Sequence, residues 1–208
     1  MRFAFVLYPG VEPIDLAALG VLSMARRVLP ELEFFTVARE AGLVELANGL
    51  RVDADHAYED CPTVDWLVVP GGPGWPSAAN DSALLSFIRE RADTTGVMSV
   101  CTGAMILAAT GLLDGRSATT KVQVLAGEAT PLALLAEQYP AVTVTTALVV
   151  DGGQIITGGG VSLCMDTMLY LLRRSFSAEL VDEVERVLEY RAAAEANRQR
   201  LPTVLPLE

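Results

Sequence analysis

The chain alternates between short, uniformly apolar runs and longer segments whose apolar residues recur at helical spacing. The apolar runs, typical of buried strands, lie at residues 2–8, 32–38, 65–69 and 96–100. Helical spacing is found at residues 13–28, 81–93 and 102–112. Asp81 is placed to cap the second of these helices. Because parallel strands require crossover connections, this order predicts an α/β fold with a doubly wound, mainly parallel sheet and helices on both faces.

The rest of the chain continues the pattern with shorter elements. Extended segments are predicted at residues 117–120 and 142–146, and helices at 131–138, 161–174 and 177–190. The helix at 161–174 is very apolar, and the last one is amphipathic. Small β-hairpins are predicted around Asn48-Gly49 and, between strands 148–150 and 154–157, around Asp151-Gly152-Gly153. Periodicity is lost from Ala193, so we expect one domain over residues 1–192 and a C-terminal tail or arm over 193–208.

Composition narrows the class of protein. The chain has 208 residues, of which 51% are hydrophobic, which is enough for one compact domain with a large core. Its net charge of −11 and lack of a Lys/Arg cluster argue against nucleic-acid and membrane-surface partners. No apolar run is long enough to span a membrane, and three widely spaced cysteines do not suggest a disulfide framework. We therefore expect a cytoplasmic protein, and the absence of a Cys/His cluster with ligand spacing predicts no metal.

Cys101 lies between the predicted strand 96–100 and the predicted helix 102–112. A sharp turn there would project the sulfur beyond the end of the strand, as the nucleophilic serine is projected in hydrolases with a strand–nucleophile–helix elbow. The N–H groups at the start of the helix favour negative charge, so we expect a lowered thiol pKa and an accessible thiolate. The alternative is a small apolar cysteine packed in the core.

Two further loops follow predicted parallel strands, at residues 9–15 and 70–74. Right-handed crossovers bring all such loops to one edge of the sheet, so both are expected to lie near Cys101. Each has a simpler alternative: Asp15 could be an acid favoured by a helix N-terminus, and 71–74 could be only a tight turn. Gly158-Gly159-Gly160 could bind an anion ahead of its helix, although close packing of the loop is the preferred interpretation.

Five segments resemble the DJ-1/PfpI superfamily in order and spacing: Tyr8-Pro9-Gly10-Val11-Glu12-Pro13-Ile14-Asp15-Leu16, Val69-Pro70-Gly71-Gly72-Pro73-Gly74, Ser99-Val100-Cys101-Thr102-Gly103-Ala104, residues 112–120 and residues 156–160. The resemblance covers about residues 3–190. It implies a flavodoxin-like fold of the class I glutamine-amidotransferase type and a homodimer. Within the superfamily the chain is similar to the isocyanide hydratase branch and to the N-terminal domains of AraC-type regulators.

Site residues carried over by this resemblance are the nucleophile Cys101, the acidic residue Asp15 that faces it, Thr102 after the nucleophile, and Gly72, whose N–H faces it. Relatives commonly have a histidine where this chain has Lys121, and the sole histidine, His56, lies in a different region. A Cys–His dyad, and with it a peptidase, is therefore not expected. Cys164 falls in the very apolar helix and is expected in the core.

These residues suit the hydration of a small isocyanide to an N-substituted formamide without a cofactor. Cys101 would attack the terminal carbon, and Asp15, kept neutral by a raised pKa, would act as acid and base. The N–H groups of Gly72 and Thr102 would stabilise developing negative charge. An amidase, deglycase or glyoxalase reaction on the same elbow stays open, as does a non-enzymatic role as a cysteine redox sensor or a small-ligand-sensing domain.

Overall fold

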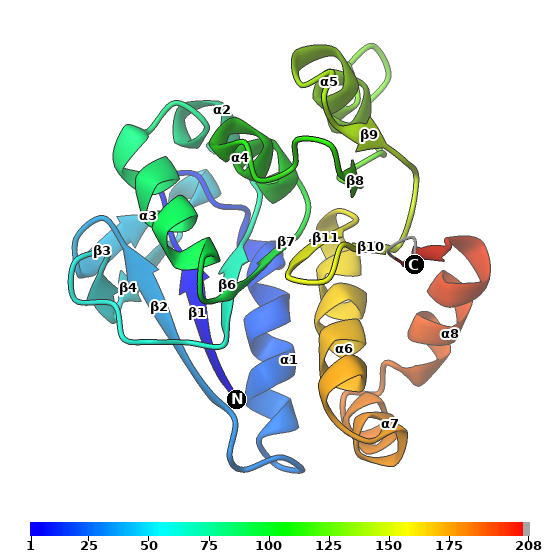
Figure 1. Ribbon diagram of the computed structural model, residues 1–208. Helices are drawn as coiled ribbons and strands as arrows, with labels where there is room; N and C mark the ends of the chain where they lie inside the picture. The colour runs from blue at the N-terminus through cyan, green and yellow to red at the C-terminus, as the bar shows by residue number, and fades with distance from the viewer. Residues whose placement is uncertain (206–208) are drawn as a thin grey trace.

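An eight-stranded sheet forms the centre of the computed structural model, which describes residues 1–205 (Figure 1). Its strands are β1 (Arg2–Val6), β2 (Glu33–Ala38), β5 (His56–Ala57), β6 (Trp66–Val69), β7 (Gly96–Ser99), β10 (Val149–Asp151), β11 (Ile155–Gly158) and β12 (Thr203–Val204). They are ordered β12-β10-β11-β7-β6-β1-β2-β5, and every neighbouring pair is parallel except β10 and β11. The predicted doubly wound, mainly parallel sheet is confirmed.

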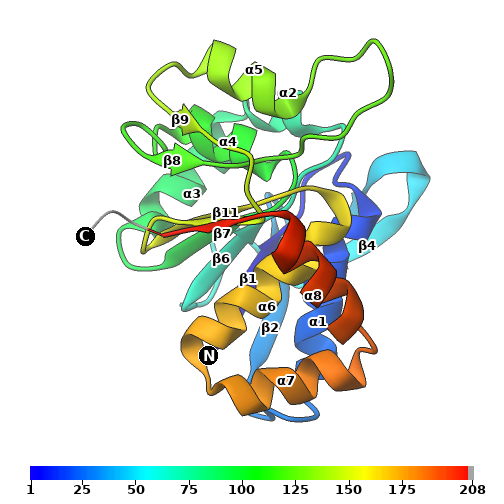
Figure 2. The same ribbon diagram turned by 90° about the vertical axis from the view of Figure 1, so that its right-hand side faces the viewer.

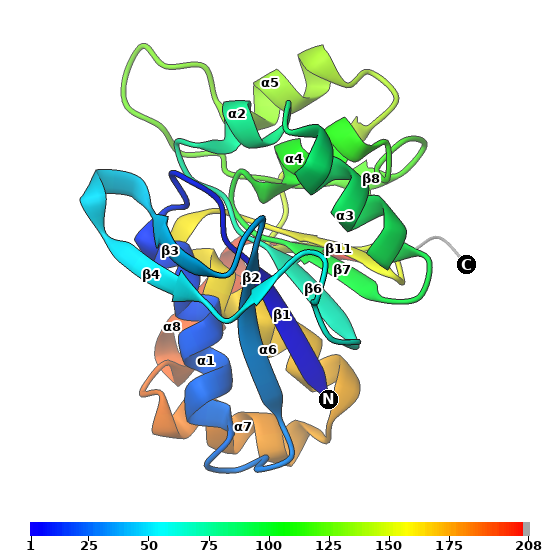
Figure 3. The ribbon, with the colours of Figure 1, turned by 90° about the vertical axis from the view of Figure 1, so that its left-hand side faces the viewer.

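Helices cover both faces of this sheet. On one face lie α1 (Ala17–Ala25), α6 (Cys164–Ser175) and α7 (Ala178–Val187), which are grouped in the lower part of Figure 2. On the other lie α2 (Trp75–Ala78), α3 (Ser82–Ala92) and α4 (Gly103–Thr110), with α5 (Pro131–Gln138) beyond them (Figure 3). Asp81 caps α3 as predicted, accepting hydrogen bonds from the N–H groups of Ala83 and Leu84.

Strand β1 shows why the sequence has uniformly apolar runs. Phe3 and Phe5 belong to the core under α1 and α6, whereas Ala4 and Val6 belong to the core under α3 and α4. Successive side chains of a strand point to opposite faces, so a strand with helices on both sides is apolar at every position.

The small hairpins are formed as predicted. Strands β3 (Gly42–Glu45) and β4 (Arg51–Ala54) pair antiparallel, and Asn48 and Gly49 between them have φ of 58° and 81°. The second hairpin is β10–β11, within the main sheet. The predicted strands at 117–120 and 142–146 are shorter than expected, and as β8 (Ser117–Ala118) and β9 (Thr143–Val144) they pair with each other.

The segment from residue 193, expected to be a tail or arm, is regular structure. Helix α8 (Arg191–Arg200) packs beside α7, and β12 adds a parallel edge strand next to β10. Ala194 is the only buried residue of α8, so the helix has no apolar stripe for the sequence pattern to reveal. Polar partners hold it instead: Arg198 bonds to Glu185, which is 1% exposed, and Asn197 bonds to the buried Asp166. Residues 206–208 lie outside the described part.

Within residues 1–205, no helix combines the length and apolar character needed to cross a membrane.

Helix α4 begins at a glycine that lets it approach the sheet closely. A Cβ at Gly103 would lie 2.1 Å from the carbonyl oxygen of Val69, whereas a Cβ at Gly20, inside α1, would have no neighbour within 4 Å. We expect Gly103→Ala to lower the free energy of unfolding by about 1–3 kcal/mol through overpacking, and Gly20→Ala to raise it by about 0.5–1 kcal/mol. Urea unfolding of both variants measures this, and equal effects would contradict the close packing of α4.

Candidate active site

Cys101 occupies a strained turn between β7 and α4. Its φ is 53°, in the left-handed region that non-glycine residues rarely adopt. Two hydrogen bonds hold the turn: the Cys101 N–H donates to the Gly159 oxygen at 3.1 Å, and the Thr120 hydroxyl donates to the Cys101 oxygen at 2.7 Å. The sharp elbow predicted from the sequence is therefore present.

The loop after β6 packs directly on this elbow. A Cβ at Gly71 would lie 2.4 Å from both the Thr102 nitrogen and its hydroxyl oxygen, so only glycine fits at this contact. The Gly71 N–H donates to Asp15 Oδ2 at 2.7 Å, and the Gly72 N–H donates to Thr102 Oγ1 at 2.9 Å. The three loops expected at one edge of the sheet thus meet there.

Asp15 is the most deeply buried acidic residue near Cys101. It lies in η1 (Pro13–Leu16), the turn before α1, and is 0% exposed. Burial raises its pKa to about 7, against the opposing effects of the hydrogen bond from the Gly71 N–H and of the neighbouring Cys101 thiol. Asp15 Oδ1 has no hydrogen-bond partner among the described residues. The raised pKa agrees with the sequence-based prediction.

The thiol pKa does not follow the prediction. Cys101 is 3% exposed, and burial together with the charge of Asp15 raises its pKa to about 12. The N–H groups of Thr102 and Val161 and the charge of Lys121 act in the opposite direction but are outweighed. The expected lowering by the helix N-terminus is therefore wrong for the resting site, where the proton is held on sulfur.

Cys101 opens onto a cavity of about 440 Å³. Apolar walls are supplied by Trp75, Val124, Leu134 and Val161, and the charged groups that line the cavity are Glu12, Lys121 and Glu128. Gly72 and Thr102 line it beside the sulfur. The Lys121 ammonium also bonds to the Gln123 carbonyl. A volume of this size accommodates a small organic molecule.

The structure brings Asp15, Cys101, Thr102 and Gly72 together, with one difference in geometry. The Gly72 N–H is bound to the Thr102 hydroxyl, so it does not point at the sulfur as expected. The Val161 N–H, which faces Cys101, was missed. The signal for it was the glycine run 158–160, which ends β11, the strand beside β7.

His56 and Cys164 lie outside the group formed by Asp15, Gly72, Cys101 and Thr102. His56 is on the edge strand β5 and packs edge-on against Phe35. Cys164 is fully buried in the core, as predicted, with its sulfur 3.6 Å from the Ile14 carbonyl oxygen. No group of three or more His, Cys, Asp or Glu side chains within residues 1–205 is arranged to hold a metal ion.

Known proteins of one family resemble this chain. The model of the DJ-1/PfpI family matches residues 1–174. Isonitrile hydratase of Pseudomonas putida is 32% identical over 195 residues, which are 93% of this chain and 80% of that protein. The HTH-type transcriptional regulator CdhR of Pseudomonas aeruginosa is 31% identical over 204 residues, which cover 96% of this chain but 58% of the regulator.

Solved structures share the fold as well. A ThiJ/PfpI family protein from Pseudomonas syringae has a TM-score of 0.77 and 27% identity, covering 91% of this chain and 74% of that one. The family match spans every strand of the main sheet except β12, together with the elbow and the loops that meet at Cys101. The chain belongs to the DJ-1/PfpI family.

Proposed function

We propose that this protein is an enzyme that hydrates small isocyanides to N-substituted formamides, with Cys101 as the nucleophile. The observation that carries the proposal is the buried Asp15 carboxyl group beside the cavity-lining Cys101, with its Oδ1 lacking a hydrogen-bond partner among the described residues. An unsatisfied buried carboxylate oxygen is costly, and it is suited to receive and return a proton. The similarity to an isonitrile hydratase supports this choice of reaction.

In the first step, the Cys101 sulfur bonds to the terminal carbon of the isocyanide. The ionised Asp15 accepts the thiol proton as the bond forms and then delivers it to that carbon, which gives a thioimidate bound to the enzyme. The high thiol pKa makes the sulfur a strong nucleophile once its proton has moved to Asp15. The N–H groups of Thr102 and Val161 stabilise the negative charge on sulfur during the transfer.

In the second step, water adds to the thioimidate carbon. Asp15 takes a proton from this water and passes it to the imine nitrogen, which gives a tetrahedral intermediate with a hydroxyl group. The intermediate expels the sulfur as its C–O bond becomes a carbonyl, and the hydroxyl proton passes through Asp15 to the sulfur. The products are the formamide and the regenerated thiol, so the net reaction adds one water molecule to one isocyanide. We assign Thr102 Oγ1 to orient this water and Gly72 to orient Thr102 through its 2.9 Å hydrogen bond.

A second candidate function is the sensing of a small ligand. It is favoured by the similarity to a transcriptional regulator over 96% of this chain. In that case the same cavity would bind a molecule without turnover, and Cys101 would be a contact residue. An assay of formamide formation separates the two, because sensing requires no product.

Replacement of the nucleophile gives the direct test. We expect Cys101→Ala to reduce isocyanide hydration by at least about 10³-fold, because no other group can form the covalent intermediate. Formamide formation from a panel of alkyl and aryl isocyanides, followed by liquid chromatography, measures this. Cys61→Ala is the matched control and should retain activity within about twofold, since Cys61 does not line the cavity. Full activity in Cys101→Ala would refute the assignment, and an inactive wild type would favour ligand sensing.

The protonation of Asp15 sets the expected pH dependence. The carboxylate is needed to accept the thiol proton, so alkylation of Cys101 by iodoacetamide should rise with pH through an apparent pKa of about 7 and then level off. In Asp15→Asn the thiol titrates alone, and the rate should increase steadily across this range. Peptide mass spectrometry at a series of pH values follows the reaction. An identical inflection in Asp15→Asn would show that another group controls the thiol.

Burial of the Asp15 charge should also cost stability. Its pKa is about 7 in the folded protein against an ordinary value of 3.8. The contribution of Asp15 to the free energy of unfolding is therefore most favourable below pH 3.8 and is lost as the pH rises through 7. At pH 8 the loss amounts to roughly 4 kcal/mol. We therefore expect Asp15→Asn to gain stability relative to wild type as the pH increases from about 4 to 8, measured by urea unfolding. A stability difference that is independent of pH would contradict the buried charge.

A further inference from the structure

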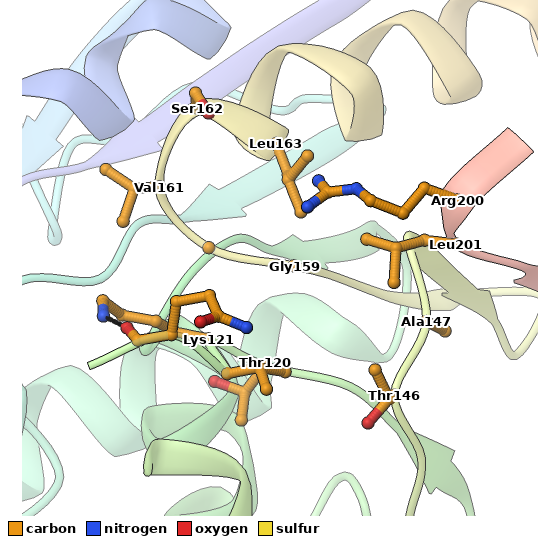
Figure 4. Close-up of a pocket in the computed structure, with 13 residues that line it drawn as sticks. Thr120, Lys121, Thr146, Ala147, Gly159, Val161, Ser162, Leu163, Arg200 and Leu201 are labelled. Atoms are coloured by element: carbon orange, nitrogen blue, oxygen red, sulfur yellow. Dashed lines mark hydrogen bonds between the residues drawn. The ribbon is translucent and has the colours of Figure 1, made fainter. Parts of the chain in front are cut away.

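A second cavity, of about 320 Å³, shares Lys121 and Val161 with the cavity of Cys101 (Figure 4). Four segments that are distant in the sequence form its walls: residues 120–123 after β8, 146–147 before β10, 159–163 between β11 and α6, and 200–201 at the end of α8. Cys101 does not line it, whereas Lys121 and Val161 line both cavities.

The charge of this cavity is opposite to that of the protein. Lys121 and Arg200 line it, and no carboxylate among residues 1–205 does so, although the chain carries a net charge of −11. Within the same described residues, neither cation forms an ion pair with an acidic side chain. Two cations without a counter-charge in one cavity attract an oxyanion.

The C-terminal segment is held so that Arg200 reaches this cavity. Arg198 and Asn197 anchor α8 to Glu185 and Asp166, and the Leu148 N–H donates to the Pro202 oxygen at 2.8 Å. Arg200 and Leu201 then lie across the cavity from Lys121 (Figure 4). One Arg200 nitrogen, Nη2, donates to Asn197 Oδ1 at 3.2 Å, which leaves other guanidinium N–H groups for a ligand.

Apolar groups line the remainder of the cavity. Val122, Leu163 and Leu201 are apolar lining residues, and Gln123, Ser162 and Thr146 are polar ones. A ligand that suits both the cationic and the apolar lining residues has a carboxylate and a short apolar part. The planar Arg200 guanidinium can donate two parallel hydrogen bonds to a carboxylate, and burial of apolar surface is favourable.

We infer that this cavity is a second binding site, for a small organic carboxylate held between Arg200 and Lys121, and that its occupancy slows the reactions of Cys101. The coupling passes through Lys121, whose charge lowers the pKa of both Cys101 and Asp15 in the empty protein. A carboxylate bound to Lys121 offsets that charge, so a smaller fraction of Cys101 is ionised.

Binding is tested by calorimetric titration of the full chain with butyrate and benzoate, each against its neutral amide, butyramide and benzamide. We expect the carboxylates to bind and the amides to bind at least about tenfold more weakly. Arg200→Gln should lower carboxylate affinity about tenfold or more, because it removes one charge-assisted partner. Arg27→Gln, on an exposed position remote from the cavity, removes the same charge and should bind as wild type does. Equal binding of acid and amide, no binding of either, or unchanged affinity in Arg200→Gln would overturn the inference.

The coupling is tested by the rate at which iodoacetamide, a neutral reagent, alkylates Cys101 at fixed pH. Saturating butyrate should slow the wild-type rate at least about twofold, whereas the same concentration should leave Arg200→Gln nearly unaffected. A wild-type rate that butyrate does not change would refute the coupling. Neither measurement uses an isocyanide, so failure of the hydratase assignment and failure of this site are distinguishable.

Discussion

The carboxyl group of Asp15, buried against the Cys101 thiol, is the constraint on which the site depends. Burial raises the pKa of both groups, to about 7 and about 12, and leaves one proton between them above neutral pH. The carboxylate is kept in place by one N–H group, from Gly71, while its other oxygen is left for the proton. The fold tolerates this uncompensated group because rigid elements surround it on all sides.

Close backbone approach supplies that rigidity. Glycine at position 71 allows the loop after β6 to lie against the elbow, and glycine at position 103 allows the first turn of α4 to lie against the end of β6, both at distances that no Cβ permits. The left-handed conformation of Cys101 is then fixed by hydrogen bonds to Gly159 and Thr120, which belong to two further loops. Strain at the nucleophile is thus sustained by the packing of neighbouring segments.

Polar contacts organise the other end of the molecule. Glu185 of α7 and Asp166 of α6, both buried, bind α8 through Arg198 and Asn197, and so connect the last part of the chain to these two helices. The same contacts place Arg200 beside the loop that carries Lys121, which also lines the cavity of Cys101. In this way the cavity that the C-terminal segment lines and the cavity of Cys101 share a wall.

The sequence alone determined the mainly parallel sheet, the elbow at Cys101 and the meeting of three loops beside it. These features follow from apolar periodicity and glycine positions, which encode local structure directly. It also indicated Asp15, Thr102 and Gly72. The tertiary structure decided the protonation of Cys101, since the burial of its sulfur and the charge beside it are long-range properties. It also decided that the Val161 N–H faces Cys101. The regular structure of residues 191–204 was decided there as well, because α8 is held by polar partners distant in sequence and carries almost no apolar pattern.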